Sequence, residues 1–217
     1  MTSALKFVKT ILYERQLLRR KWNEINNQPR RNAGALKHTK MKNFTFISNL
    51  HLVCGKDKLR SSMQCVHFKN GYAYASNDCV LIKQPLSLSN IQESKNLEGK
   101  AIHSSIFKEI RKMKHVVCTP DGFECRTKDN QKVFYQYSET NTPPDFEAVI
   151  PKDELEGVAE IGINPAFVAL LGKAMAGGAY GLKAVFRGAR RAIVFEPLQQ
   201  EYNGEIGLIM PMVFTNI

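Results

Sequence analysis

Runs of strand-forming apolar residues separated by polar turns occupy most of the chain, and the clearest pair of runs predicts a β-hairpin. Residues 63–68 and 72–75 flank the dipeptide Asn70-Gly71. Asn-Gly supplies the two positive φ angles that a tight type I′ turn needs. A third strand is predicted at 80–84, followed by a polar loop.

From residue 100 the spacing of apolar residues becomes helical. Ile106, Ile110 and Met113 recur at i, i+4 and i+7, and Ser104 or Ser105 is the candidate N-cap. Lysine and arginine occupy the other face of this helix. After the helix the pattern predicts three strands, at 116–118, 123–127 and 131–137.

The last third of the chain repeats this order of elements. Residues 160–163 form a predicted strand, and Asn164 followed by Pro165 is a typical helix start, an N-cap before a proline at the first helical position. The helix is predicted to run through 166–175. Three more strands follow, at 182–187, 191–196 and 205–210.

The segment before the hairpin fits a further copy with a shortened helix. Residues 44–46 have the pattern of a strand, and 47–53 fit either a short helix or an extended continuation. The order strand, helix and three strands therefore recurs about three times. This recurrence predicts an α+β protein built from repeated βαβββ units.

Positive charge is concentrated near the N-terminus. The 217 residues carry a net charge of +11, and residues 1–40 hold ten Lys or Arg against two Glu, a net charge of +8. The segment predicts a basic helix and a polar linker, whose Arg15, Arg19, Arg20 and Lys21 are candidate contacts to DNA. Other interpretations stay open: a membrane-surface helix, a solvated helix, an organellar transit peptide, or translation that begins at Met41.

Composition argues against several classes of protein. No apolar run approaches the ~20 residues that span a bilayer, and no secretory signal pattern is present. Five cysteines are an odd number in a chain that is too large to need disulfides, which favours free thiols. We therefore expect a cytoplasmic protein without a membrane partner.

Patterns that would indicate catalysis or metal binding are weak. His115, Cys118 and Cys125 match no common zinc spacing. The glycine-rich run at 177–181 lacks the Gly-Lys-Ser/Thr of a phosphate loop. No carboxylate pair or nucleophile triad is recognisable, so we expect no catalytic residue, no metal, no cofactor and no enzyme activity.

Two apolar strand ends that are interrupted by proline differ from the rest of the pattern, at 143–151 and 207–212. Proline removes a backbone donor and suits the exit of a strand. Such ends leave apolar side chains able to form a shelf: Val149, Leu208, Met210 and Met212. Because methionine adapts to varied peptides, one interpretation is a docking surface, and the other is ordinary strand ends under a core.

The two stretches resemble the end of the middle domain and the extreme C-terminus of the β subunit of bacterial DNA polymerase III, the sliding clamp. Residues 60–68, 71–78 and 100–114 resemble further clamp segments in the same order, so the likeness extends over roughly 43–217. The resemblance implies a DNA-clamp fold, with helices on one face of antiparallel sheets.

The resemblance also divides the chain. The full-length bacterial subunit has six repeats. The three repeats of this chain correspond to a whole middle domain followed by the last half-domain. The predicted domains are a basic helix and linker at 1–40, a clamp-like domain of two units at 41–151, and a clamp-like half-domain at 152–217.

Two sets of binding residues follow from the resemblance. Basic residues of the helices are expected to face DNA: Lys108, Arg111, Lys112, Lys114 and Lys173. Apolar residues and prolines are expected to form a cleft for a short linear motif: Leu81, Pro144, Val149, Leu208, Met210, Pro211 and Met212. The chain departs from the family at Asp78-Cys79-Val80, at Ala148 and at Val213-Phe214, which predicts a changed peptide preference.

The implied function is that of a processivity factor, a homo-oligomeric ring that encircles double-stranded DNA and docks a DNA polymerase or repair factor. A clamp loader is a further partner to expect. The alternative is a clamp-fold interaction protein that forms no ring and contacts nucleic acid through its basic tail. A hydrolase or nuclease on an unrecognised fold ranks far behind. Lysine, proline or bulges on edge strands would favour the form without a ring.

Overall fold

The computed structural model describes residues 46, 48–113, 115–139, 144–152, 154, 157–158 and 160–213. Contacts divide the chain into two units, Met1–Lys42 and Asn43–Ile217, and every described residue belongs to the second unit. The predicted basic helix with Arg15, Arg19, Arg20 and Lys21 lies outside the described residues, and so does Lys114.

The first repeat consists of three strands behind a short 3-10 turn. Its elements are η1 (Leu50–Leu52), η2 (Ser61–Gln64), β1 (Cys65–Lys69), β2 (Tyr72–Ser76) and β3 (Val80–Pro85). The predicted hairpin is confirmed: β1 pairs antiparallel with β2, and Asn70 and Gly71 have φ of 51° and 75°. Of the two alternatives for 47–53, the structure has the short helical one, as the single turn η1.

The second repeat has the full predicted order of strand, helix and three strands. Its elements are η3 (Leu86–Leu88), η4 (Ser94–Leu97), β4 (Ala101–His103), α2 (Ser104–Ile110), β5 (His115–Cys118), β6 (Gly122–Arg126) and β7 (Lys132–Gln136). The predicted serine cap is wrong. His103 is the N-cap, and its Nδ1 accepts a hydrogen bond from the amide of Ser105 at 3.3 Å. His103 is also the last residue of β4, and its ring nitrogen takes the place of the usual side-chain oxygen acceptor of a helix cap.

The third repeat begins with a capped helix. Its elements are α3 (Pro165–Ala174), η5 (Gly178–Tyr180), β8 (Leu182–Val185), β9 (Ile193–Pro197), η6 (Gln200–Tyr202) and β10 (Ile206–Ile209). Asn164 caps α3 as predicted, since its Oδ1 accepts from the amide of Ala166 at 3.0 Å.

The strand predicted at 160–163 is reduced to one antiparallel bridge between Gly162 and Met212. The chain after β10 offers few free amides for a longer ladder. The amide of Met210 donates instead to the carbonyl of Cys79 at 2.8 Å, and Pro211 has no amide hydrogen.

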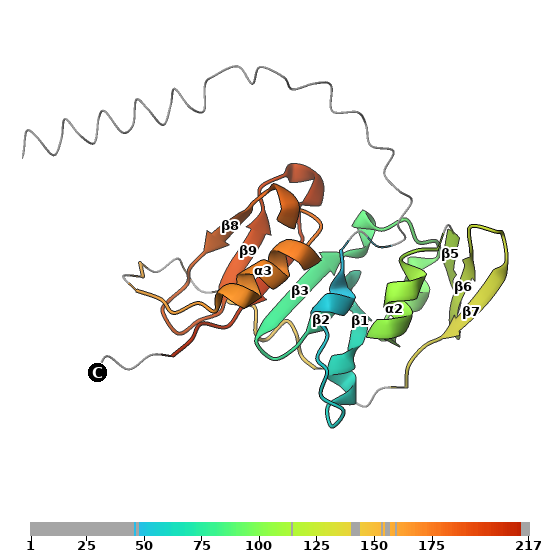
Figure 1. The fold of residues 1–217 in the computed structure, drawn as a ribbon, viewed down its shortest axis with the longest axis horizontal. Helices are drawn as coiled ribbons and strands as arrows, with labels where there is room; N and C mark the ends of the chain where they lie inside the picture. Colours follow the sequence, from blue (N-terminus) through green and yellow to red (C-terminus); the bar gives the residue numbers. More distant parts are fainter. Residues whose placement is uncertain are drawn as a thin grey trace, which may run out of the picture. The chain divides into compact units, whose positions relative to one another are not determined.

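Seven strands form one antiparallel sheet in the order β4-β1-β2-β3-β10-β9-β8, and β5-β6-β7 form a second sheet (Figure 1). The large sheet is continuous across the first and third repeats because β3 pairs with β10. In this register Leu81 lies opposite Leu208. Two strands that are far apart in the sequence thereby become neighbours.

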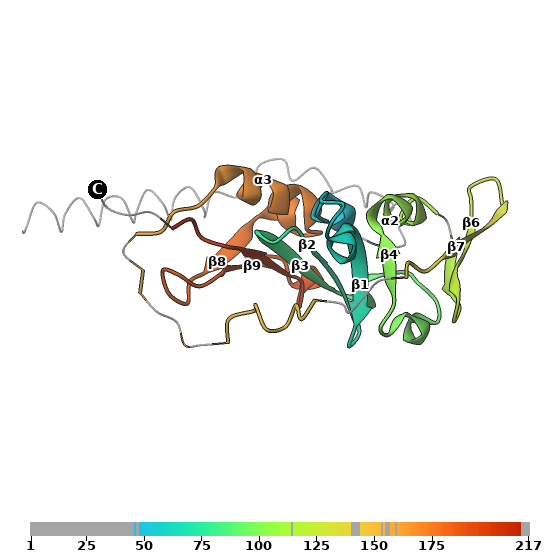
Figure 2. The same cartoon turned by 90° about the horizontal axis from the view of Figure 1, so that it is seen from below.

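Both helices lie on one face of the strands, as Figure 2 shows. The main core lies between helices and strands and includes Phe46, Phe107, Ile82, Leu171 and Ile209. A smaller core lies on the opposite face of the large sheet and includes Tyr74, Leu81, Phe146, Val194 and Leu208. The predicted α+β architecture of repeated units, with helices on one face of antiparallel sheets, is confirmed.

Asn49 joins the ends of the two helices. Its amide donates to the carbonyl of Ala174 at 2.6 Å, and its Nδ2 donates to the carbonyl of Lys173 at 2.9 Å. Its Oδ1 accepts from Nη1 of Arg111, the residue that follows α2. The C-terminal ends of α2 and α3 therefore meet at one side chain.

Candidate functional site

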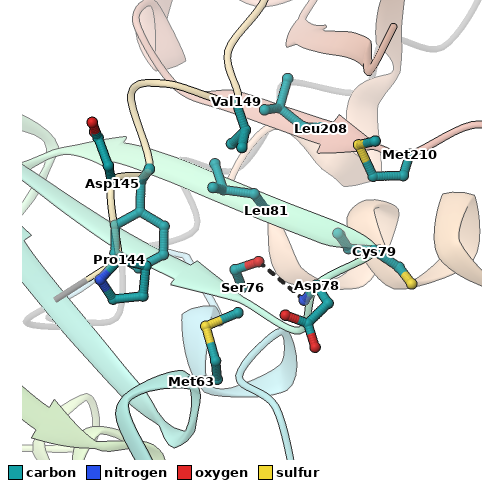
Figure 3. A pocket seen from close by; sticks show the side chains of 12 residues that line it. Met63, Ser76, Asp78, Cys79, Leu81, Pro144, Asp145, Val149, Leu208 and Met210 are labelled. Atoms are coloured by element: carbon teal, nitrogen blue, oxygen red, sulfur yellow. Dashed lines mark hydrogen bonds between the residues drawn. The ribbon is translucent and has the colours of Figure 1, made fainter. Parts of the chain in front are cut away.

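A cavity of about 240 Å³ opens on the face of the large sheet opposite the helices (Figure 3). Strands β3 and β10 form its floor, and the segment 144–149 forms one wall. Five of the seven predicted cleft residues line it: Leu81, Pro144, Val149, Leu208 and Met210. Pro211 and Met212 do not line this cavity, and Met212 pairs with Gly162 instead.

The cavity has a buried apolar floor and a half-exposed apolar rim. Leu81 and Leu208 are neighbours across β3 and β10, and both are buried. At the rim Val149 is 49% exposed and Met210 is 44% exposed. Large apolar side chains that stay open to solvent around a concave floor are typical of a binding surface.

Phe146 and Glu147 hold the wall of the cavity against the sheet. The ring of Phe146 stacks on that of Tyr74, with centroids 5.3 Å apart and an interplanar angle of 7°. Oε1 of Glu147 accepts from the hydroxyl of Tyr74 and from Nζ of Lys83, each at 2.6 Å. Burial raises the pKa of Glu147, but the hydrogen bonds from Lys83 and Tyr74 outweigh it and hold the pKa below its usual value. The wall is therefore fixed by a carboxylate that stays ionised.

The opposite rim is the tight turn between β2 and β3. Asp78 adopts a φ of 74°, in the left-handed region that aspartate tolerates better than most residues. Its amide donates to Oγ of Ser76 at 3.3 Å (Figure 3), and Oδ1 of Asn77 accepts from the amide of Val80 at 2.8 Å. The Asp78 carboxylate forms a 2.6 Å salt bridge with Arg60, and both side chains are more than half exposed. This rim is acidic and shaped by local turn chemistry.

Sequence reasoning missed three apolar residues that line the cavity, Met63, Val80 and Phe146. Met63 belongs to η2, and no local pattern marks it as a neighbour of β3. Phe146 did carry a signal, because it is a single aromatic residue between Asp145 and Glu147 in a proline-rich stretch. An apolar residue in such a polar segment generally needs a place to be buried.

The predicted DNA-facing residues that lie on the helices are partly brought together. Lys108 is exposed on α2, Lys112 is exposed two residues after the end of α2, and Lys173 is exposed on α3. Lys112 forms a 3.0 Å salt bridge with Glu109 three residues earlier, and exposed pairs of this kind are weak. All three lysines belong to the helix layer, on the face of the sheet opposite the cavity.

Arg111 has a different environment from these lysines. It is half-buried, and its Nε donates to the carbonyl of Phe46 at 3.1 Å while Nη1 donates to Oδ1 of Asn49. Burial lowers the pKa of Arg111. These contacts use much of the guanidinium to fix the chain before η1 against α2.

His51 is partly buried near positive charges of the helix layer, and its pKa is lowered. Burial, followed by the positive charges of Arg111, Lys108 and Lys112, lowers the pKa of His51 to about 4. Its Nδ1 is buried without a hydrogen-bond partner among the described residues. Burial is thus the largest cause of the lowered pKa of His51, and the three nearby cations add to it.

The structure separates the residues that might have formed a metal site. Strand register places His115 beside Arg126 on the exposed face of the small sheet, whereas Cys118 and Cys125 face the core. Burial, the largest cause, raises the pKa of both thiols to about 12. Within the described ranges no group of three His, Cys, Asp or Glu side chains is placed to hold a metal ion.

The glycine-rich run after α3 is occupied by a side chain of the protein itself. The carboxylate of Glu205 accepts from the amide of Ala176 at 3.0 Å and from that of Gly177 at 3.4 Å. Oγ of Ser48 also donates to Oε1 of Glu205 at 2.5 Å. Amides that could hold a phosphate are thus already bonded to an internal carboxylate.

None of the helices in the described part of the chain has the length and apolar character to cross a membrane.

Solved structures with a similar fold include bacterial sliding clamps. The DNA polymerase sliding clamp of Pseudomonas aeruginosa superposes with a TM-score of 0.59 and 10% identity, over 81% of this chain and 64% of that chain. The clamp of Bartonella birtlesii, bound to griselimycin, gives a TM-score of 0.55 and 11% identity over 81% and 64%. The clamp of Bacillus subtilis gives 0.52 and 13% over 78% and 62%.

The chain therefore spans less than two thirds of the length of these clamps. No family model matches its sequence, and no curated protein matches it by sequence either. At 10–13% identity the likeness establishes the fold, and the expected DNA-clamp fold is confirmed.

Proposed function

We propose that this protein is a divergent DNA sliding clamp, a processivity factor that tethers partner proteins to double-stranded DNA. The observation that carries the proposal is the apolar cavity on β3, β10 and 144–149, at the positions where the clamp resemblance expects motif docking. In this proposal the protein is a cytoplasmic binding platform and catalyses no reaction.

The cavity suits a short extended peptide with apolar anchors. Leu81 and Leu208 provide a fixed floor, and Val149 and Met210 provide apolar rim surface that a ligand would remove from water. Each Å² of apolar surface buried contributes roughly 25 cal/mol, so a few anchors give useful but reversible affinity. The expected partner is a DNA polymerase or a repair factor that carries such a motif.

The helix layer is the surface that we assign to DNA. Lys108, Lys112 and Lys173 are exposed there, and the pKa of His51 is lowered first by burial and then by Arg111, Lys108 and Lys112. A clamp needs only contacts to phosphates, which are independent of sequence and weaken with salt. Residues 1–40, with a net charge of +8, would add to this attraction.

A ring would need several copies of this chain, because one copy corresponds to less than two thirds of a bacterial clamp subunit. We propose a homo-oligomer, opened onto DNA by a clamp loader. Among the described residues the edge strands are β4 and β8 in the large sheet and β5 and β7 in the small sheet, and Gln92 already bridges to Val117 of β5.

A specific observation favours the alternative, a clamp-fold protein that forms no ring. The edge strand β8 carries the exposed Lys183, and the edge strand β7 carries the exposed Lys132. Lysine on an edge strand disfavours the addition of another strand. Such a protein would contact nucleic acid through its basic tail and still use the cavity for partners.

Solution mass decides between the two forms. Light scattering should be measured on the full chain and on a chain that begins at Met41. A discrete oligomer in both samples supports the ring, and the protein should then be retained on circular DNA and lost from linear DNA. A monomer at micromolar concentration would contradict encirclement and leave the non-ring alternative.

A further inference from the structure

A second cavity of about 440 Å³ adjoins the first one. Val149 and Met210 line both, so the two cavities adjoin across these side chains, and we call the pair the groove. The second cavity lies between the segment 147–152 and the turn that leads into β9, which contributes Arg190, Arg191 and Ala192.

The second cavity is lined by exposed cations. Lys152, Arg190 and Arg191 are all exposed to solvent. Within the described chain, neither Lys152 nor Arg190 has a salt-bridge partner. The acidic residue of this cavity, Glu147, already accepts from Lys83 and Tyr74 at 2.6 Å each. The lining therefore carries three cations against this one carboxylate, whose pKa Lys152 also helps to lower.

The first cavity has the opposite character. Its charged lining residues are Asp78, which forms a salt bridge with Arg60, and Asp145. In Figure 3 Asp78 and Val149 lie on opposite sides of Leu81, so Asp78 is separated from a side chain that also lines the second cavity. A ligand lying in the whole groove passes from an apolar site without a cationic lining residue to a basic site.

We propose that the groove selects linear peptides in which apolar anchors are followed on one flank by Asp or Glu. The apolar anchors occupy the first cavity, and the acidic side chains pair with Lys152 and Arg190 in the second. This inference rests on the proposed docking function and adds a specificity to it. Arginine and lysine pair with carboxylates by charge-assisted hydrogen bonds, and complementary charge also raises the rate of association.

The test is selection of random peptides displayed on phage against the full-length protein. Three proteins are compared: the wild type, the double variant Lys152→Glu/Arg190→Glu, and a matched control, Arg126→Glu/Lys132→Glu. The control has the same change of charge on exposed side chains of β6 and β7. Peptides that lose binding to a Met210→Asp variant are assigned to the groove, since Met210 lines both cavities and is half exposed.

We expect the wild type and the control to enrich groove-dependent peptides with Asp or Glu on one flank of an apolar core. The Lys152→Glu/Arg190→Glu variant should enrich Lys or Arg on that flank. Replacing the acidic residues of a selected peptide by Asn or Gln should weaken binding to the wild type about fivefold, because two partly exposed ion pairs are lost. The difference should shrink at high salt.

Two results would overturn the inference, and they are distinguishable. Groove-dependent peptides without acidic enrichment would remove the proposed specificity and leave docking intact. Failure to select any peptide that depends on Met210 would remove the docking function, and the specificity with it.

Discussion

The two faces of the large sheet are built from the same strands, but they are covered to different extents. On one face η1, α2 and α3 pack on the strands, and side chains such as Ile82 and Ile209 have no exposed surface. On the other face the cover is the segment around Phe146, and Val149 and Met210 stay half exposed.

Because of this difference, one face of the sheet stabilises the fold and the other keeps surface for recognition. The alternation of side chains along a strand supplies apolar residues to both faces. Where helices cover the face, burial stabilises the fold. Where a single loop covers it, apolar surface remains for a partner. We therefore expect substitutions on the helix face to affect unfolding, and substitutions on the loop face to affect binding.

The largest effect on stability is expected from Phe107→Ala. Phe107 is fully buried in the main core, with its ring centroid 4.6 Å from that of Phe46. Removing a buried phenylalanine ring should lower the free energy of unfolding by about 3–5 kcal/mol, measured by urea denaturation. Phe134→Ala, at a 53% exposed position, is the control and should cost less than about 1 kcal/mol. Equal losses for the two variants would contradict this assignment of the core.

A smaller effect is expected from Phe146→Ala on the loop face. The ring is 7% exposed and stacks on Tyr74, so its loss should cost about 2 kcal/mol. Because Phe146 holds the wall of the first cavity, groove-dependent peptides should also lose at least tenfold in affinity. Phe146→Leu should recover part of both losses. Unchanged peptide binding in Phe146→Ala would show that the wall does not depend on this ring.

A pH dependence is expected from His51 on the helix face. Its folded-state pKa of about 4 lies below the unfolded value of 6.5. A depressed pKa gives stability that is present above pH 6.5 and is lost as pH falls towards 4. His51 is only partly buried, so solvent screening reduces the loss to about 1 kcal/mol.

The measurement is urea denaturation of the wild type and of His51→Gln between pH 7 and pH 4. Glu205 titrates with the opposite sign, because burial, the largest cause, raises its pKa, and this contribution is common to both proteins. The difference between the two curves should therefore isolate His51. Parallel curves would contradict the lowered pKa of His51.

The smallest effect on stability is expected from Met210→Asp. Met210 is 44% exposed after β10, so the free energy of unfolding should change by no more than about 0.5 kcal/mol. Peptide binding should nevertheless fall at least tenfold, because a carboxylate replaces apolar surface shared by both cavities. Leu198→Asp, which is exposed and lines neither cavity, is the control and should leave binding unchanged.

Local chemistry made much of the fold predictable from the sequence. The Asn70-Gly71 turn and the Asn164 cap depend on groups within a few residues, so their sequence signals survive in the folded chain. The strand at 160–163 and the serine cap failed where a neighbouring element competed, at Pro211 and at His103. Five of the residues that the resemblance assigned to a cleft line one cavity, and sequence identity to the solved clamps is 10–13%.

The sequence by itself determined the order of elements, the repeat, the turn and cap residues, and the concentration of positive charge in residues 1–40. Only the tertiary structure decided that β3 pairs with β10, that Arg111 donates to Asn49, and that Lys152 and Arg190 line one cavity with Met210. The reason is physical. Turns and caps are stabilised by contacts within a few residues, whereas sheet register and groove charge come from segments that meet only after the whole chain has packed.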